Sequence, residues 1–268
     1  MTSVAPPLAG GATIAPGYEV LDHLSRGHEL DVYDVWSEER ACRCAAKLLR
    51  PDVGADDAAR RRLRREGRLL RRLAHPHLVR AYEVIELEQG PMVVLETLEG
   101  ATLSHLIRDQ GRALPAAEIA HLGLHLCSAM HYLHDKGHLH LDLKPSNVIS
   151  DYGRAKVIDL SLARRPGKVP AGVGTRQYLS PEQARGGRVE AATDVWGVGG
   201  VLWAAATRLR PFPRTEGPPE QLERRAESVS AHRRLPRRLR RAIDGCLEPE
   251  TASRPTLTEL SEDLEAIL

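Results

Sequence analysis

The hydrophobic pattern of this chain changes its period once, near Gly100, and this change constrains the fold more than any other feature. Before Gly100, short apolar stretches alternate with polar residues and end at turn-forming residues, which is typical of strands. After Gly100, apolar residues recur with a helical period over longer stretches. We therefore predict an α+β fold in which a small antiparallel sheet lobe with one helix precedes a larger, mainly helical lobe.

The sheet lobe is predicted over residues 17–98. It follows an uncharged segment over residues 1–16, rich in proline, glycine and alanine, which we expect to be a flexible tail. One helix is predicted from about Asp56 to Leu73, because acidic residues at its start suit the helix dipole. Five segments are predicted as strands: YEVLDHLS, DVYDVWS, CRCAAKLL, VRAYEVIEL and MVVLET.

The helical lobe is predicted over residues 99–268. Its longest apolar run, Val195–Ala206, is much shorter than the ~20 residues that cross a membrane, so it predicts a buried helix. Short strands are expected at Val148–Ile149 and Lys156–Ile158, and a loop over residues 160–182. Helices are predicted over residues 102–110, 115–136, 191–208, 217–228, 235–247 and 256–267. The crevice between the two lobes is the expected ligand site.

Charge and cysteine content restrict the partners and the compartment. The 38 basic and 36 acidic residues leave a net charge of only +2, whereas a nucleic-acid binder normally has a strongly basic balance. The 4 cysteines have no metal-ligand spacing, which fits a reducing compartment. The N-terminus lacks the basic and apolar regions of a signal peptide. We expect a cytoplasmic protein without a nucleic-acid partner or a membrane segment, and the sequence predicts no oligomeric state.

Polar residues gather in the stretch HLHLDLKPSNVIS, residues 138–150. Pro145 and Asn147 indicate a rigid loop that enters a short strand. Asp142 and Asn147 on this loop, together with Asp159 at the end of the next strand, offer oxygen ligands of the kind that Mg²⁺ uses alongside phosphates.

A lysine lies in an otherwise apolar strand, CAAKLL, at position 47. Burying Lys47 alone would be costly, and Glu66 on the following helix is its obvious partner. Lys47, Glu66, HLDLKPSN, DLS and SPE occur in one order, at separations that resemble those of protein kinases. From about Tyr18 to Leu268 the chain resembles the catalytic domain of a bacterial eukaryotic-like (Hanks-type) Ser/Thr protein kinase, which has a bilobal fold.

The resemblance implies a reaction and the residues that perform it. The reaction is transfer of the γ-phosphoryl group of ATP to a serine or threonine hydroxyl of a protein substrate, with Mg²⁺ or Mn²⁺. By resemblance, Lys47 holds the α- and β-phosphates and is held in turn by Glu66. Asp142 orients the substrate hydroxyl and accepts its proton. Lys144 places positive charge near the transferring group.

The resemblance also implies how the nucleotide and its metal are bound. Asn147 and Asp159 would bind Mg²⁺. The backbone at Gly27 would approach the phosphates most closely. The hinge that contacts adenine would be the backbone from Glu96 to Leu98, with Leu95 as the gatekeeper residue.

The glycine-rich loop and the DLS motif depart from the family pattern. The three glycine positions of the loop fall on Ser25, Gly27 and Leu30, so a bulky side chain stands where the family prefers none. In DLS, Leu160 can fill an apolar slot, whereas Ser161 replaces a glycine and removes a flexible hinge.

The regulatory positions also depart from the pattern. Leu141 stands where many kinases have an arginine that binds a phosphate on the activation loop. From residue 162 to residue 174 the sequence LARRPGKVPAGVG contains no serine, threonine or tyrosine. We therefore predict an activation segment that is ordered by packing, through Leu141, Leu160 and a structural ion pair between Glu182 and Arg254, and not by phosphorylation.

Two further polar residues are predicted to be structural. Asp194 in TDVW is expected to anchor or cap a helix. His140 matches the core histidine of the kinase loop, which argues against a role as a metal ligand.

Two functions from different classes fit this sequence. The first is an active kinase, and the second is a pseudokinase that serves as a nucleotide-binding or protein-interaction scaffold. The catalytic reading is favoured because all six polar catalytic positions are present, and a scaffold has no reason to retain such costly groups together. They are Lys47, Glu66, Asp142, Lys144, Asn147 and Asp159.

Overall fold

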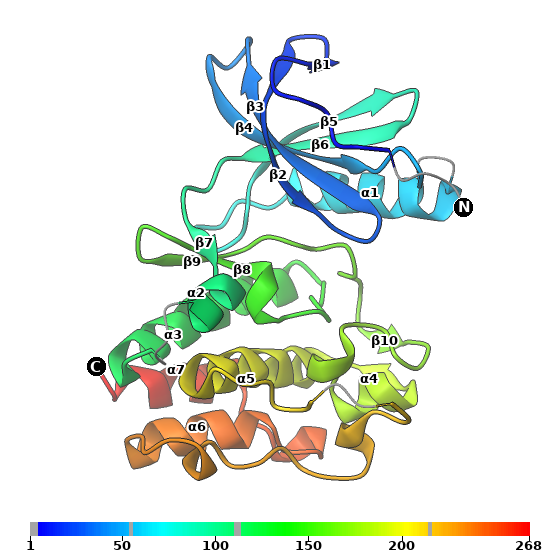
Figure 1. The fold of residues 1–268 in the computed structure, drawn as a ribbon. Helices are drawn as coiled ribbons and strands as arrows, with labels where there is room; N and C mark the ends of the chain where they lie inside the picture. Colours follow the sequence, from blue (N-terminus) through cyan, green and yellow to red (C-terminus); the bar gives the residue numbers. More distant parts are fainter. Residues whose placement is uncertain (1–4, 54–55, 110–113, 214–215) are drawn as a thin grey trace. The chain divides into compact units, whose positions relative to one another are not determined.

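The computed structural model describes residues 5–53, 56–109, 114–213 and 216–268. The chain divides between Glu99 and Gly100 into two units (Figure 1). The N-terminal unit holds a large antiparallel sheet and one long helix, and the C-terminal unit is mainly helical. The predicted α+β class, with a sheet lobe and a helical lobe, is confirmed.

The sheet of the N-terminal unit has six strands in the order β1-β2-β3-β4-β6-β5, and every neighbouring pair is antiparallel. The strands are β1 (Thr13–Ala15), β2 (Tyr18–Arg26), β3 (Leu30–Ser37), β4 (Cys42–Leu49), β5 (Ala81–Leu87) and β6 (Gly90–Glu96). Five of them match the predicted segments. The sixth, β1, lies within the segment that was expected to be a flexible tail. It pairs with β2 and buries Ile14 and Ala15, but three residues are too few to display a period in the sequence.

Helix α1 (Asp57–Leu70) packs against the sheet of its own unit, mainly on β5 and β6. The Asp56 carboxylate caps its first turn by accepting hydrogen bonds from the N–H groups of Ala58 and Ala59, at 2.7 and 3.2 Å. Gly67 allows the close approach, because a Cβ there would lie 2.7 Å or less from two valine side chains of the sheet. The predicted helix is confirmed and ends before Leu73.

The C-terminal unit is built around helix α5, which is buried from Thr193 to Ala206 and packs against α3 and α6. This confirms the buried helix predicted from the long apolar run. The helices of this unit are α2 (Leu103–Asp109), α3 (Ala116–Asp135), α4 (Pro181–Arg185), α5 (Ala191–Thr207), α6 (Arg237–Cys246) and α7 (Leu257–Glu265). Its strands are β7 (Ala101–Thr102), β8 (Val148–Asp151), β9 (Arg154–Val157), β10 (Gly167–Lys168) and β11 (Arg188–Val189).

The helix predicted over residues 217–228 is wrong. Only a single helical turn, Glu220–Leu222, forms there. Pro218 and Pro219 open the segment, and its two apolar residues cannot form a stripe that would hold a helix against the core. The predicted loop over residues 160–182 also contains more structure than expected, including β10 and the first turn of α4.

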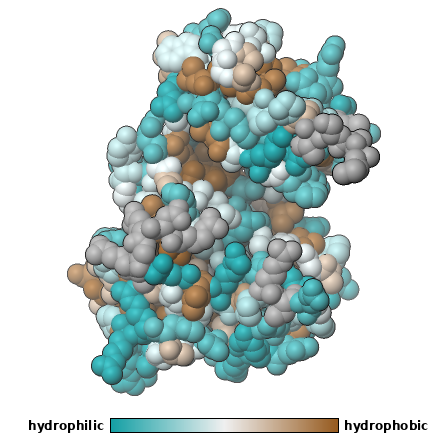
Figure 2. Space-filling view, viewed as in Figure 1, coloured by the Kyte–Doolittle hydropathy of each residue, from teal (hydrophilic) through white to brown (hydrophobic). Residues whose placement is uncertain are grey.

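The surface of the C-terminal unit is mainly hydrophilic on the face that Figure 2 shows. No helix within the described ranges is long and apolar enough to cross a membrane.

Candidate active site

The predicted site residues fall into two groups, one in each unit. Gly27, Lys47, Glu66, Glu96 and Leu98 belong to the N-terminal unit. The C-terminal unit carries the others, which are Asp142, Lys144, Asn147 and Asp159.

Lys47 and Glu66 form a buried ion pair between β4 and α1. The ammonium nitrogen of Lys47 lies 2.8 and 2.9 Å from the two carboxylate oxygens of Glu66. The residues are only 7 % and 2 % exposed, so neither charge could stand there without the other. The predicted partnership is confirmed.

The turn between β2 and β3 contains the remaining glycine of the loop, Gly27. Its N–H donates a 2.7 Å hydrogen bond to the carbonyl of Leu30, which closes a tight turn. Arg26 and Asp31 bridge the base of this hairpin with two hydrogen bonds of 2.8 Å. Arg50 donates to the carbonyls of Gly27 and His28 at 3.2 and 3.1 Å. Side-chain charge therefore fixes a turn that has lost two of the family's glycines.

The segment after β6 presents unused backbone groups at the predicted hinge. The N–H of Glu96 is bonded to the carbonyl of Arg80 at 2.9 Å. Within the described ranges, neither the N–H nor the carbonyl of Leu98 makes a backbone hydrogen bond. The hydroxyl of Thr97, between them, is buried without a partner. A ligand with both donors and acceptors along one edge, such as adenine, fits these groups.

The loop that carries Asp142 is anchored to the buried helix α5 through Asp194. The Asp194 carboxylate accepts hydrogen bonds from the N–H groups of His140 and Leu141, at 2.8 and 2.9 Å. It also lies 2.8 Å from Nε2 of His134. Leu141 adopts a left-handed conformation with φ +66°, which is uncommon for a residue with a side chain. Asp194 is therefore a structural anchor, as predicted.

The Asp142 carboxylate is held on both oxygens. Oδ1 accepts a 2.8 Å hydrogen bond from the N–H of Thr175, and Oδ2 lies 2.7 Å from the ammonium group of Lys144. The same ammonium group donates to the hydroxyl of Thr175 at 2.6 Å. Asn147 donates to the carbonyl of Asp142 at 2.9 Å. A carboxylate fixed beside an ammonium group can accept a proton while positive charge remains close by.

Thr175 is the member of this cluster that sequence reasoning missed. Its position in GTRQYLSPE indicated only a substrate-facing segment, and the sequence separation of 33 residues gave no sign of contact with Asp142.

His140 supports Asp142 from the core. Its Nδ1 accepts a 3.1 Å hydrogen bond from the N–H of Asp142, while its Nε2 is buried without a partner in the part of the chain that the structure describes. Burial lowers the pKa of His140 because the charged imidazolium is disfavoured away from water. His140 is therefore a neutral core residue and not a metal ligand.

Asn147 and Asp159 lie close together at one end of the β8–β9 hairpin. The N–H of Ile158 donates to the carbonyl of Asn147 at 3.0 Å, which brings the residue before Asp159 against Asn147. The amide nitrogen of Asn147 points to Asp142, so its amide oxygen remains an acceptor for a cation. Among the described residues no cluster of three or more His, Cys, Asp or Glu side chains could hold a metal. Two oxygen ligands completed by phosphate oxygens are the arrangement that suits Mg²⁺.

The segment after Asp159 packs on Leu141. The Leu141 side chain is 3 % exposed and belongs to an apolar cluster with Leu139, Val169 and Val189. Val173, which is partly buried, packs against the same cluster. Two branched residues of residues 160–182 thus contact a leucine that stands in an arginine's place.

The end of this segment is fixed by the predicted ion pair. Arg254 donates to both carboxylate oxygens of Glu182, at 2.8 and 2.9 Å, and its guanidinium lies 5.0 Å from the centre of the Trp196 ring. Burial opposes ionisation of Glu182, but the hydrogen bonds from Arg254 outweigh it and hold the pKa of the carboxyl below its ordinary value. The Glu182–Arg254 prediction is confirmed.

Comparison with known proteins relates this geometry to one family. The family described as protein kinase domain matches residues 18–264. The serine/threonine-protein kinase PknB of Mycobacterium leprae is 34% identical over 206 residues, which cover 73% of this chain and 33% of the relative. PknB of Mycobacterium tuberculosis is 37% identical over 180 residues, which cover 63% of this chain and 29% of the relative. The chain thus spans about a third of the length of these relatives.

A solved structure extends the likeness to nearly the whole chain. A crystal structure of the PknI kinase domain of Mycobacterium tuberculosis superposes with a TM-score of 0.78 at 25% identity. The superposition covers 97% of this chain and 99% of that one.

Proposed function

Because this chain belongs to the protein kinase family, we propose that it transfers the γ-phosphoryl group of ATP to serine or threonine hydroxyls of a protein substrate. The observation that carries the proposal is the Asp142 carboxylate, held by the Thr175 N–H at 2.8 Å and by Lys144 at 2.7 Å. Such a carboxylate is oriented, ionised and close to a positive charge. These are the properties that the acceptor side of phosphoryl transfer requires.

The chemical step assigns one task to each of these groups. The substrate hydroxyl oxygen bonds to the γ-phosphorus while the bond from that phosphorus to the β–γ bridging oxygen breaks, and ADP leaves. The hydroxyl proton passes to the Asp142 carboxylate. Lys144, 2.7 Å from Asp142, stabilises negative charge on the transferring group.

The nucleotide is assigned to groups that both units supply. Lys47, fixed by Glu66, would contact the α- and β-phosphates, and the turn at Gly27 would lie over them. The peptide groups from Glu96 to Leu98 would bind the adenine edge. Asn147 and Asp159 would hold a divalent cation, Mg²⁺ or Mn²⁺, which neutralises phosphate charge when bound.

The activation segment, residues 160–182, is proposed to be ordered without phosphorylation, which makes this a kinase without the usual arginine before the catalytic aspartate. Leu141 in place of that arginine is buried among apolar side chains. No residue from 162 to 174 has a hydroxyl that could be phosphorylated. All 4 cysteines are free and 3 are buried, which supports a reducing, cytoplasmic compartment.

Phosphoryl transfer from labelled ATP tests the proposal. Purified protein is incubated with Mg²⁺ or Mn²⁺ and with both an acidic and a basic generic protein substrate. We expect transfer by the wild type, loss of transfer in Asp142→Asn and Lys47→Met, and retention in Arg241→Gln, an exposed residue of α6. Absence of transfer by the wild type under every condition, or equal transfer by Asp142→Asn, refutes the proposed function.

A further inference from the structure

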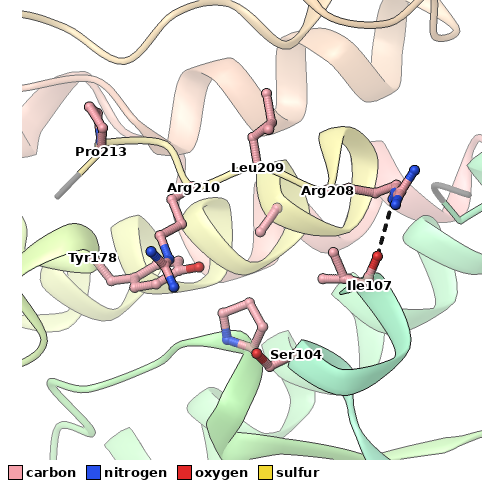
Figure 3. A pocket seen from close by; sticks show the side chains of 9 residues that line it. Ser104, Ile107, Tyr178, Arg208, Leu209, Arg210 and Pro213 are labelled. Carbon is pink, nitrogen blue, oxygen red and sulfur yellow. Dashed lines mark hydrogen bonds between the residues drawn. The ribbon is translucent and has the colours of Figure 1, made fainter. Parts of the chain in front are cut away.

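A pocket of about 440 Å³ lies within the C-terminal unit (Figure 3). Helix α2 contributes Ser104 and Ile107 to its wall, and the segment that follows α5 contributes Leu209, Arg210 and Pro213. Pro145, Tyr178 and Ala204 complete the lining together with Arg208. None of the roles assigned above uses this pocket.

The pocket adjoins both segments that hold Asp142. Pro145 opens the turn Pro145–Asn147, whose last residue donates to the Asp142 carbonyl. Tyr178 donates its N–H to the carbonyl of Thr175 at 2.8 Å, and Thr175 is bonded to the Asp142 carboxylate. A peptide whose hydroxyl reaches Asp142 therefore passes close to the pocket.

The lining carries positive charge without a counterion. It contains two arginines and two hydroxyl groups, and none of the described lining residues is acidic. The Arg208 Nε donates to the carbonyl of Ile107 at 3.1 Å, which ties the end of α5 to α2 (Figure 3). Arg210 is exposed and forms no ion pair or hydrogen bond with another described residue. Burial raises the pKa of Tyr178 to about 12, so its hydroxyl stays protonated and can donate.

The backbone and the floor of the pocket favour access to these donors. Arg208 ends α5 in the left-handed conformation, φ +66°, where glycine is normally preferred. An arginine retained at such a position is an observed strain that calls for a functional reason. Ala204 presents only a methyl group to the pocket, which leaves room for an incoming side chain.

We infer that this pocket binds an anionic side chain of the protein substrate, a carboxylate or a phosphate, close to the hydroxyl that is phosphorylated. The inference rests on the proposed function and adds a substrate class to it: sequences that are acidic near the target residue. The planar guanidinium of Arg210 suits either anion, because it can donate two parallel hydrogen bonds to a pair of oxygens.

A peptide scan tests the inference through catalysis. Peptides with one serine carry Glu, phosphoserine, Gln or Lys at each flanking position in turn, and kcat/KM is measured for each. We expect kcat/KM to be about fivefold higher for Glu than for Gln at one or two positions. Arg210→Gln should remove most of this preference, Arg210→Glu should turn it toward Lys, and Arg241→Gln should leave it as in the wild type. A preference for phosphoserine over Glu assigns the pocket to phosphate.

A binding measurement tests the pocket independently of catalysis. The Glu and Gln peptides are titrated against Asp142→Asn by fluorescence anisotropy. Tighter binding of the Glu peptide, which disappears when Arg210→Gln is added, supports the inference. Equal binding of the two peptides overturns it, as does an acidic preference that survives in Arg208→Gln and Arg210→Gln. Failure of the proposed function looks different, because no peptide is then phosphorylated although the binding difference persists.

Discussion

The carbonyl oxygen of Leu141 accepts a 2.8 Å hydrogen bond from the side-chain amide of Gln183. The same amide donates to the carbonyl of Val173, also at 2.8 Å. One buried glutamine thus connects the residue before Asp142 with the activation segment, through neutral groups alone. This connection, together with the apolar cluster around Leu141, gives the activation segment an order that requires no phosphate.

Replacing Leu141 by arginine should destabilise the C-terminal unit. The variant buries a guanidinium in the apolar cluster with Val169 and Val189, and we expect the free energy of unfolding to fall by about 3 kcal/mol or more. Urea unfolding measures the change. The matched control, Leu141→Met, keeps the volume and should cost less than about 1.5 kcal/mol. Equal stability of the two variants would contradict packing as the source of order.

Divalent metal should determine how strongly ATP stabilises the protein. Because Asn147 and Asp159 offer oxygen atoms and no positive charge, ATP with Mg²⁺ should raise Tm well above the value with ATP alone. At a hundredfold excess over Kd, a ligand adds about 2.7 kcal/mol of stability. In Asp159→Ala the extra shift due to Mg²⁺ should vanish, whereas in Asp135→Ala, at the exposed end of α3, it should persist. Identical shifts with and without Mg²⁺ would refute these metal ligands.

Leu30→Gly should tighten ATP binding without raising turnover at saturating ATP. The carbonyl of Leu30 accepts the hydrogen bond from Gly27, and this backbone bond survives the substitution. Removing the side chain lets the turn approach the phosphates more closely, and we expect Kd for ATP to fall about threefold. Leu30→Ala should give an intermediate Kd. An unchanged Kd would mean that the turn fixed by Arg26 and Arg50 already closes over the phosphates.

The pKa of His140 predicts an acid-sensitive fold. Because burial lowers this pKa in the folded state, the unfolded chain takes up a proton below its ordinary pKa of about 6.5 and the folded one does not. The contribution to stability is complete above about pH 6.5 and declines as the pH falls, by at most about 1.4 kcal/mol per pH unit. In His140→Phe the loss of unfolding free energy between about pH 7 and pH 5.5 should be about 1 kcal/mol smaller than in the wild type. Equal losses in the two proteins would show that His140 does not titrate on unfolding.

The interactions that could be predicted from the sequence are those in which an isolated group has no other good choice. A lysine in an apolar strand requires an acid, and Glu66 was the acid available. The long apolar run of α5 had to be buried because it has no polar face. Asp56 caps α1 because its short acidic side chain precedes the first turn.

The interactions that could not be predicted depend on where loops meet. The hydrogen bonds of Gln183 with Leu141 and of Thr175 with Asp142 join neutral groups far apart in the chain, and neither partner needs the other on grounds of composition. The helix expected over residues 217–228 failed because charged residues with good helix propensity carried the prediction without an apolar stripe to hold them.

The most direct test is the rate of phosphoryl transfer by enzyme that carries no phosphate. The protein is treated with phosphatase, and mass spectrometry verifies that residues 160–182 are unmodified. The treated enzyme is then assayed with labelled ATP and Mg²⁺, beside Asp142→Asn. We predict a rate within about twofold of the untreated enzyme, and a rate at least about a hundredfold lower for Asp142→Asn. A large loss of activity that phosphorylation between residues 160 and 174 restores would contradict order by packing, and equal rates for the wild type and Asp142→Asn would contradict the catalytic site.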